Sequence, residues 1–239
     1  MISKTQGIVL NRYKYTDNKV IVHIFTRLHG KRAFIIYNSK SKKKKIINLF
    51  QPLFILDLEI SQKQRSNFAN IKEVSIHKPY QTLTSSPEKL AIVFFISEIL
   101  SKTIDEEQID EALFDFLIES FVLLDNCKKP ANFHIAFLAA YSIYIGIMPE
   151  NNFDVHNKYF NIREGKFTTK YSKDYSMNEN LSKKFFSILD GGITGFQKIQ
   201  FNKNERNAII SKIINFFAYN FNNISKFKSL DVLIEVFND

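Results

Sequence analysis

The sequence predicts an α+β protein in two parts: a five-stranded OB-like β-barrel over residues 1–80, and a mainly α-helical domain with a small β-hairpin insertion over residues 81–239. Three observations support this prediction. Short runs of β-branched and aromatic residues, separated by turn residues, fill the first part. After Pro79 the apolar residues recur with the helical period of about 3.6. The charge changes at the same place, because residues 1–80 hold sixteen Lys/Arg and four Asp/Glu, whereas residues 81–239 hold seventeen and twenty.

Five strand-like segments predict the barrel. They are short and apolar, and they cover residues 7–10, 20–25, 33–37, 53–58 and 74–77. Turn signals at residues 16–18 and 29–31 separate them. Five short strands in this length suit a small closed barrel, which hides its edges by closure. An OB-like barrel is our prediction, and an SH3-like barrel is a rival that the spacing does not exclude.

The second part shows a succession of amphipathic helices. Ser86-Pro87 is a helix-start signal, and the helix that follows is expected to run to about Lys102. Further helices are expected over about 109–124, 133–144, 181–189, 203–220 and 230–237. Residues 151–176 lose the helical period, and residues 159–168 are expected to form a hairpin that turns at Glu164-Gly165.

Composition restricts the class of protein. Hydrophobic residues make up 45% of the chain, which suffices for a buried core. Cys127 is the single cysteine, so neither an intrachain disulfide nor a cysteine-cluster metal site can form, and we expect a reducing, cytoplasmic compartment. The longest apolar run, residues 90–100, is about half the length that a bilayer crossing needs and contains Glu98, so we expect no membrane segment.

The sequence offers no convincing catalytic or metal-binding set. Its five histidines are scattered, and no pair has the i, i+4 spacing of a helical metal site. The glycine cluster at 191–195 lacks the Lys-Ser/Thr of a phosphate loop and fits a helix C-cap. Asp57 and Glu59 lie on one side of a predicted strand, and with a third acid they would suit a magnesium-dependent nuclease, which stays open as an alternative. We expect a non-enzymatic protein with no catalytic residue, cofactor, metal or small-molecule substrate.

Basic residues of the first part are the most informative feature. A compositional bias of the genome would act on both parts of the chain alike, whereas a binding surface for polyanions explains a charge of +12 confined to residues 1–80. Basic residues around an OB-type groove bind phosphates by releasing counterions. The candidate DNA-binding residues are Arg12, Lys14, Lys19, Arg27, Lys31, Arg32, Lys40, Lys42, Lys43, Lys44 and Lys45.

Aromatic residues close to these bases could provide stacking platforms. Tyr13, Tyr15 and Tyr37 are candidates, while Phe34 is better explained as a core residue. The lysine run at residues 40–45 also suits phosphate headgroups, so a peripheral adaptor that binds anionic lipid is a second alternative.

Several motifs, in order along the chain, match those of one known family. They are Gly7–Leu10, Tyr15 with Asp17–Val22, Phe25–Lys31, Leu49–Leu53 followed by Leu56–Glu59, and Phe137–Tyr141 with Gly146–Pro149. These motifs resemble those of the RecO family of recombination mediators, and the resemblance is most specific in the first part of the chain.

The resemblance implies a bacterial repair mediator that binds single- and double-stranded DNA and anneals complementary strands. With a RecR-like partner it would help load recombinase onto strands coated by single-strand-binding protein, whose C-terminal tail is a further implied partner. It implies a cytoplasmic, nucleoid-associated protein. Many members carry a four-cysteine zinc site after the Gly-x-x-Pro turn, but residues 151–156 contain no cysteine. We therefore expect side-chain packing, without zinc, to hold the hairpin.

Overall fold

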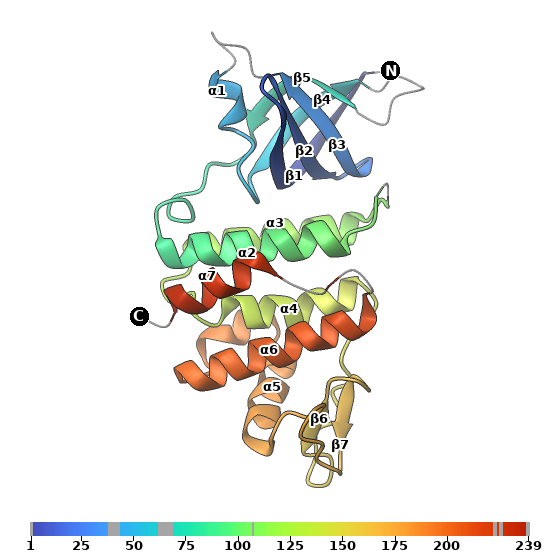
Figure 1. Cartoon of the computed structure of the whole chain (residues 1–239), viewed down its shortest axis with the longest axis vertical. Coiled ribbons are helices and arrows are strands. Elements are labelled where there is room, and N and C mark those ends of the chain that lie inside the picture. Colours follow the sequence, from blue (N-terminus) through green and yellow to red (C-terminus); the bar gives the residue numbers. More distant parts are fainter. Residues whose placement is uncertain are drawn as a thin grey trace. The chain divides into compact units, whose positions relative to one another are not determined.

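The computed structural model describes residues 2–37, 44–61, 69–106, 108–221, 224 and 227–237 (Figure 1). The chain forms two compact units, Met1–Ser86 with Val93–Asp125 and Pro87–Ile92 with Asn126–Asp239. The first unit thus contains helical segments beside the barrel. The division at residue 80 was predicted from charge and pattern, and it stays a prediction.

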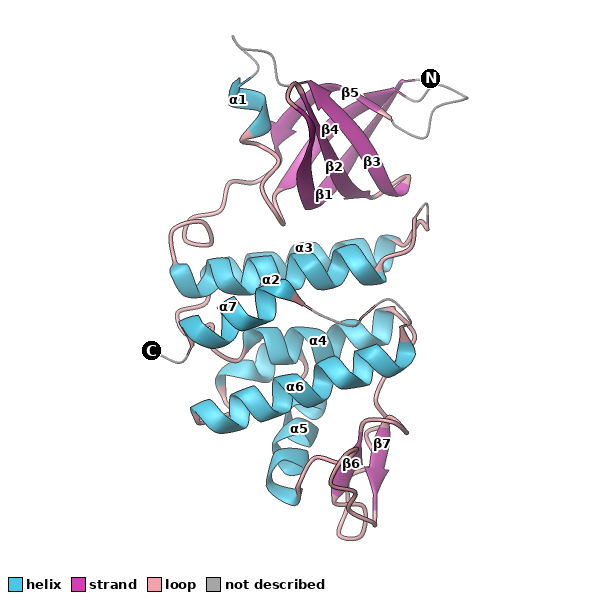
Figure 2. Ribbon diagram, in the orientation of Figure 1, coloured by secondary structure: helices cyan, strands magenta, loops and turns pink. Residues whose placement is uncertain are grey.

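Five antiparallel strands form the barrel of the first unit: β1 (Ile2–Thr16), β2 (Lys19–Thr26), β3 (Gly30–Tyr37), β4 (Ile55–Ser61) and β5 (Asn70–Ile76). Their order is β3-β2-β1-β4-β5, and Figure 2 shows the five strands gathered in one barrel. A parallel bridge between Phe34 and Ala69 joins the two ends of the sheet, and the Ala69 N–H donates to the Ala33 carbonyl at 3.2 Å. This order with its closure is OB-like, and the predicted fold class is confirmed.

Strand β1 is much longer than the predicted segment 7–10 because it pairs with two partners. Its residues 2–8 pair with β4, and its residues from Gly7 to Thr16 pair with β2. Gly7 lies where the two pairings overlap, and a Cβ atom there would stand 2.6 Å from Ile24 Cγ2 and 2.8 Å from Leu58 Cδ1. The inward-facing residues form the barrel core, which includes Val9, Val22, Ile24, Phe34, Leu56, Leu58 and Ile60.

A short helix that the sequence pattern did not predict follows the third strand. Helix α1 (Lys44–Ile47) begins within the lysine run, and Ile46 and Ile47 pack against the barrel core. Lys40, Lys42 and Lys43 lie outside the described residues. Lys44 and Lys45 belong to α1.

Two long helices follow the barrel. Helix α2 (Pro87–Thr103) begins at the proline that predicted it, and α3 spans Glu111–Asn126. Ile109, which we expected within α3, precedes it and is 57% exposed. The reason is local: the Asp110 side chain accepts a hydrogen bond from the Leu113 N–H at 2.8 Å and so caps the helix after residue 109. Ser97 of α2 donates to the Leu10 carbonyl, and Phe114 of α3 lies 5.7 Å from Phe25, so both helices contact the barrel.

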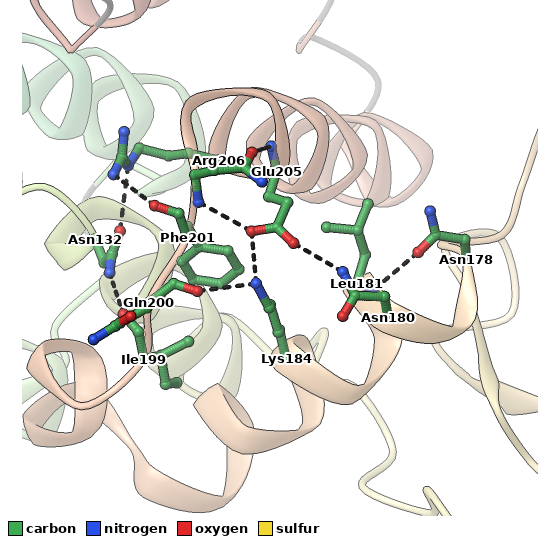
Figure 3. A network of polar contacts seen from close by, with 11 residues as sticks. Asn132, Asn178, Asn180, Leu181, Lys184, Ile199, Gln200, Phe201, Glu205 and Arg206 are labelled. Carbon is green, nitrogen blue, oxygen red and sulfur yellow. Dashed lines mark hydrogen bonds and ion pairs between the residues drawn. The ribbon is translucent and has the colours of Figure 1, made fainter.

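The second unit is mainly helical. It contains α4 (Phe133–Tyr144), α5 (Glu179–Gly191), a 3-10 helix η1 (Ile193–Gln197), α6 (Lys203–Asn220) and α7 (Lys228–Val236). A polar network fastens α5 to α6 (Figure 3). The Glu205 carboxylate accepts hydrogen bonds from Lys184 Nζ at 2.6 Å, Asn180 Nδ2 at 2.8 Å and the Asn202 N–H at 3.0 Å. The hydrogen bond from Lys184, with those from Asn202 and Asn180, lowers the pKa of Glu205 to about 2.

The predicted hairpin is present as β6 (Tyr159–Asn161) and β7 (Lys166–Thr168), with Gly165 in its turn at φ +69°. Phe160 lies 4.7 Å from the Phe185 ring and 5.1 Å from the Phe167 ring, so aromatic packing holds it, as predicted. The nearby Asp154 carboxylate accepts backbone hydrogen bonds from His156 and Asn157. Asp154 and His156 are fewer than the three or four protein ligands of a zinc site, and among the described residues no group of three or more His, Cys, Asp or Glu is arranged to hold a metal ion.

Within the part of the chain that the structure describes, no helix is both long enough and apolar enough to cross a membrane.

Candidate nucleic-acid interface

Three strands bring basic and aromatic side chains together at one end of the barrel. In β1 and β2, Lys14 pairs with Val20 and Thr16 pairs with Lys19. In β2 and β3, Lys19 pairs with Tyr37. The register therefore places the second half of β1, the start of β2 and the end of β3 side by side. We call this end of the barrel the basic rim; its members are Arg12, Tyr13, Lys14, Tyr15, Lys19 and Tyr37, with Arg12 and Lys14 on one face of β1 and Tyr13 on the other.

The tyrosines of the basic rim are exposed. Tyr13, Tyr15 and Tyr37 have 48%, 59% and 53% of their surface in contact with solvent, whereas Phe34 is fully buried, as expected of a core residue. Lys19 Nζ lies 5.5 Å from the centre of the Tyr37 ring. Exposed rings beside cations are the combination on which single-stranded nucleic acids stack.

The cations of the basic rim differ in how firmly they are held. The Arg12 guanidinium donates to the Ile47 carbonyl at 2.7 Å and to Gln51 Oε1 at 3.3 Å, so α1 and the following turn orient it. Lys14 forms an ion pair with Asp17 at 2.6 Å, and both side chains are mostly exposed. An exposed pair of this kind is weak, so a phosphate can replace Asp17. A cavity of about 310 Å³ lies here, between Arg12, Lys14 and Ile47.

Sequence reasoning missed the residues that orient Arg12. Ile47 and Gln51 follow it in the chain by 35 and 39 positions. Neither belongs to a pattern with Arg12, and the only signal was the later match of residues 49–53 to the family motif.

The other predicted bases of the barrel lie at the opposite end of β2. Arg27 follows β2 directly, and Lys31 and Arg32 stand at the start of β3. The eight residues of β2 span roughly 25 Å of extended chain, so these bases do not join the basic rim. The candidate set is thus divided between two ends of the barrel, with part of the lysine run outside the described residues.

Contacts within the first unit engage this second group. The Arg27 guanidinium forms an ion pair with Asp115 of α3 and lies 4.7 Å from the centre of the Phe114 ring. Lys31 Nζ donates to the carbonyls of Ser101 and Ile104, at the end of α2. Burial lowers the pKa of Lys31, against the raising effect of Glu106 and Asp105. These contacts favour a packing role for Arg27 and Lys31, and their DNA binding stays a prediction.

Acidic residues line a separate groove of about 580 Å³ on the outer side of β1, β4 and β5. Asp57 and Glu59 lie there, and the register pairs Glu59 with Glu73, an acid that sequence reasoning did not consider. Asp57 also contacts His77 Nδ1 at 3.1 Å. Among the described residues, however, no group of three or more His, Cys, Asp or Glu is arranged to hold a metal ion. The geometry of the groove does not support the nuclease alternative.

The strand order and its closure define an OB-like barrel, with basic residues gathered at one end, joined to a helical domain. Two family models match the chain: the recombination protein O N-terminal model over residues 1–80, and the recombination protein O C-terminal model over residues 84–223. The chain belongs to the RecO family of DNA repair and recombination proteins.

Curated relatives agree over the full length. The chain is 33% identical to the DNA repair protein RecO of Flavobacterium psychrophilum, with 98% of this chain and 99% of the relative covered. It is 32% identical to the protein of the same name from Flavobacterium johnsoniae, with the same coverage. A third, from Azobacteroides pseudotrichonymphae, is 30% identical with both chains fully covered.

Proposed function

We propose that the chain is a non-enzymatic mediator of recombinational repair that binds single- and double-stranded DNA through the basic rim and the adjoining lysine run. It anneals complementary strands and, with a RecR-like partner, helps load recombinase onto strands coated by single-strand-binding protein. The observation that supports this most strongly is the gathering of three cations and three exposed tyrosines at one end of an OB-like barrel.

The chemistry of the basic rim suits strand pairing without sequence preference. Two DNA strands repel each other through their phosphates, and lysine and arginine side chains that displace counterions reduce this repulsion. Arg12 is oriented before DNA arrives, because Ile47 and Gln51 hold its guanidinium. The tyrosine rings accept any base, since every base has a stacking face. We include the lysine run in the proposed DNA-binding residues because it lies in the chain between Tyr37 and Ile46.

The proposed protein partners rest on family membership and on the resemblance of the motifs. They are a RecR-like protein and the C-terminal tail of single-strand-binding protein, and we assign neither to particular residues. We also propose that the protein acts in the bacterial cytoplasm at the nucleoid, where its DNA substrate lies.

Salt-dependent DNA binding tests the basic rim. We expect the double substitution Lys14→Ala/Lys19→Ala to weaken binding to all sequences and to reduce the slope of log K against log salt by about 0.7–0.9 per lost phosphate contact. The quadruple substitution of Lys42–Lys45 by alanine should reduce the slope further. Lys170→Ala/Lys173→Ala is the matched control, because it removes two exposed lysines from the second unit. Fluorescence anisotropy at several KCl concentrations measures the slope.

An annealing assay then tests the function itself. Complementary strands precoated with single-strand-binding protein should anneal faster with the wild-type protein than without it, and the Lys14→Ala/Lys19→Ala variant should lose most of this effect. Equal annealing and equal salt slopes for wild type and variant would contradict the proposal. Magnesium-dependent cleavage of DNA, or sedimentation with anionic liposomes in place of DNA binding, would favour the two alternative classes instead.

A further inference from the structure

Helix α2 has a single open stripe. From Ala91 to Thr103 its side chains are buried, apart from Phe94, Glu98, Ser101 and Lys102. These four follow the i, i+4, i+7, i+8 spacing of one helix face. Phe94 is 50% exposed, while its neighbours Val93 and Phe95 are buried. A large aromatic ring is therefore half exposed on a helix whose flanking residues, Val93 and Phe95, are buried.

A cavity of about 440 Å³ lies along this stripe, and its opposite wall belongs to the barrel. Asn11, Arg12, Gln51 and Pro52 form that wall, and all lining residues belong to the first compact unit. Arg12 also lines the cavity at the basic rim. The cavity beside Phe94 therefore continues the basic rim onto α2.

The side chains around this cavity match the parts of one nucleotide. Arg12 supplies a guanidinium whose position Gln51 and Ile47 fix, which suits a phosphate. Phe94 supplies a flat, accessible ring for a base. The amides of Asn11 and Gln51 provide donors and acceptors between them. The volume is within the range of small-ligand sites, which begins at about 300 Å³.

We propose that this cavity is a nucleotide subsite for single-stranded DNA, in which an unstacked base packs on Phe94 while Arg12 binds its phosphate. The subsite rests on the proposed function, because it extends a DNA path that begins at the basic rim. The subsite predicts a preference for single-stranded over double-stranded DNA, which the basic rim alone does not give. A single strand offers unpaired bases to Phe94, whereas the bases of a duplex stay paired and stacked.

Equilibrium binding to three ligands tests the subsite: an oligo(dT), an abasic oligomer of the same length, and a duplex. We expect Phe94→Ala to weaken oligo(dT) binding roughly 5- to 150-fold, the range found when a stacking aromatic residue is removed. Binding to the abasic oligomer and the duplex should be unchanged, and Phe94→Trp should retain wild-type affinity. Tyr219→Ala is the matched control, because Tyr219 is 52% exposed but lies in the second unit.

Photo-crosslinking locates the base directly. An oligomer that carries 5-iododeoxyuridine should crosslink to the peptide that contains residue 94, and Phe94→Ala should abolish that crosslink. Because Phe94 is half exposed, its replacement leaves the core intact, and thermal melting checks this.

The outcomes separate the subsite from the proposed function. Intact wild-type binding with no effect of Phe94→Ala on oligo(dT), or with an equal loss for all three ligands, would overturn the subsite alone. A wild-type chain that binds none of the three ligands would overturn the proposed function and the subsite with it.

Discussion

Arg27 should stabilise the fold without contributing to DNA binding, although it lies in the basic part of the sequence. We expect Arg27→Ala to lower the free energy of unfolding by roughly 1–2 kcal/mol. The ion pair with Asp115 contributes at most about 1 kcal/mol, because the two side chains are 26% and 56% exposed and solvent screens them. The cation–π contact with Phe114, at 4.7 Å from the ring centre, adds about 0.5–1 kcal/mol.

A double-mutant cycle measures this interaction. Urea denaturation followed by circular dichroism gives the unfolding free energy of wild type, Arg27→Ala, Asp115→Ala and the double variant. We expect the double variant to lose less than the sum of the two single losses, because the two residues are in contact. Lys14→Ala is the matched control: its ion pair is mostly exposed, so its unfolding free energy should change by less than about 0.5 kcal/mol.

DNA binding by the same variants gives the opposite ranking. The salt slope should fall by about 0.7–0.9 for Lys14→Ala and stay at the wild-type value for Arg27→Ala. An Arg27→Ala variant of wild-type stability with a reduced slope would refute the reasoning. It would mean that Arg27 leaves Asp115 for a DNA phosphate and that the barrel binds DNA at both ends.

Three further predictions concern stability. Asp125→Ala should lower the free energy of unfolding, measured by urea denaturation, by about 2–4 kcal/mol, because the Asp125 carboxylate accepts hydrogen bonds from the backbone N–H groups of residues 81–83, one of them buried. A loss no larger than that of Asp190→Ala, at an exposed position, would contradict this prediction. Burial, with the charge of Arg206, lowers the pKa of His134 to about 3 from 6.5. As the pH falls below 6.5, the unfolded chain therefore binds a proton at His134 that the folded chain does not bind, and the free energy of unfolding falls by about 1.4 kcal/mol per pH unit towards pH 3. In His134→Gln this dependence on pH should be smaller by about 1.4 kcal/mol per pH unit. An unchanged dependence would exclude His134 as its source. Gly7→Ala should lower the free energy of unfolding by about 1–3 kcal/mol, because the Cβ atom of the new alanine would overlap Ile24 and Leu58. An unchanged melting temperature would show that the barrel relaxes around the alanine at no cost in stability.

Elements with strong local signals were predictable from the sequence. Helix α6 begins and ends within a residue of the expected range, because Asn202 and Glu205 form a capping box that fixes its start. The hairpin turns at Gly165, which adopts the positive φ that glycine tolerates best. Each of the five barrel strands overlaps its expected segment, because runs of β-branched and aromatic residues and turn signals are local, although β4 and β5 cover residues 55–61 and 70–76 instead of 53–58 and 74–77.

Features that depend on distant contacts were not predictable. The second half of β1 contains few apolar residues, and it is a strand because β2 pairs with it. Ile109 continued the apolar period of α3, but the cap at Asp110 excluded it from the helix. The partner of Arg27 lies 88 positions later, in α3. No local pattern distinguishes an arginine that pairs with a distant helix from one that does not, so the sequence placed Arg12 and Arg27 in one set.

We therefore expect the charge count of the first eighty residues to overstate the surface available to DNA. Lys31 neutralises the negative end of the α2 dipole by binding the last carbonyls of that helix, and Arg27 is neutralised by Asp115. Lys31 and Arg27 can keep these partners while the barrel packs against α2 and α3. The cations that can exchange partners are those whose present contacts are weak, and Lys14 and Lys19 meet that condition at the basic rim. We therefore expect the bases at one end of β2 to serve packing and the bases at the other end to remain for a polyanion.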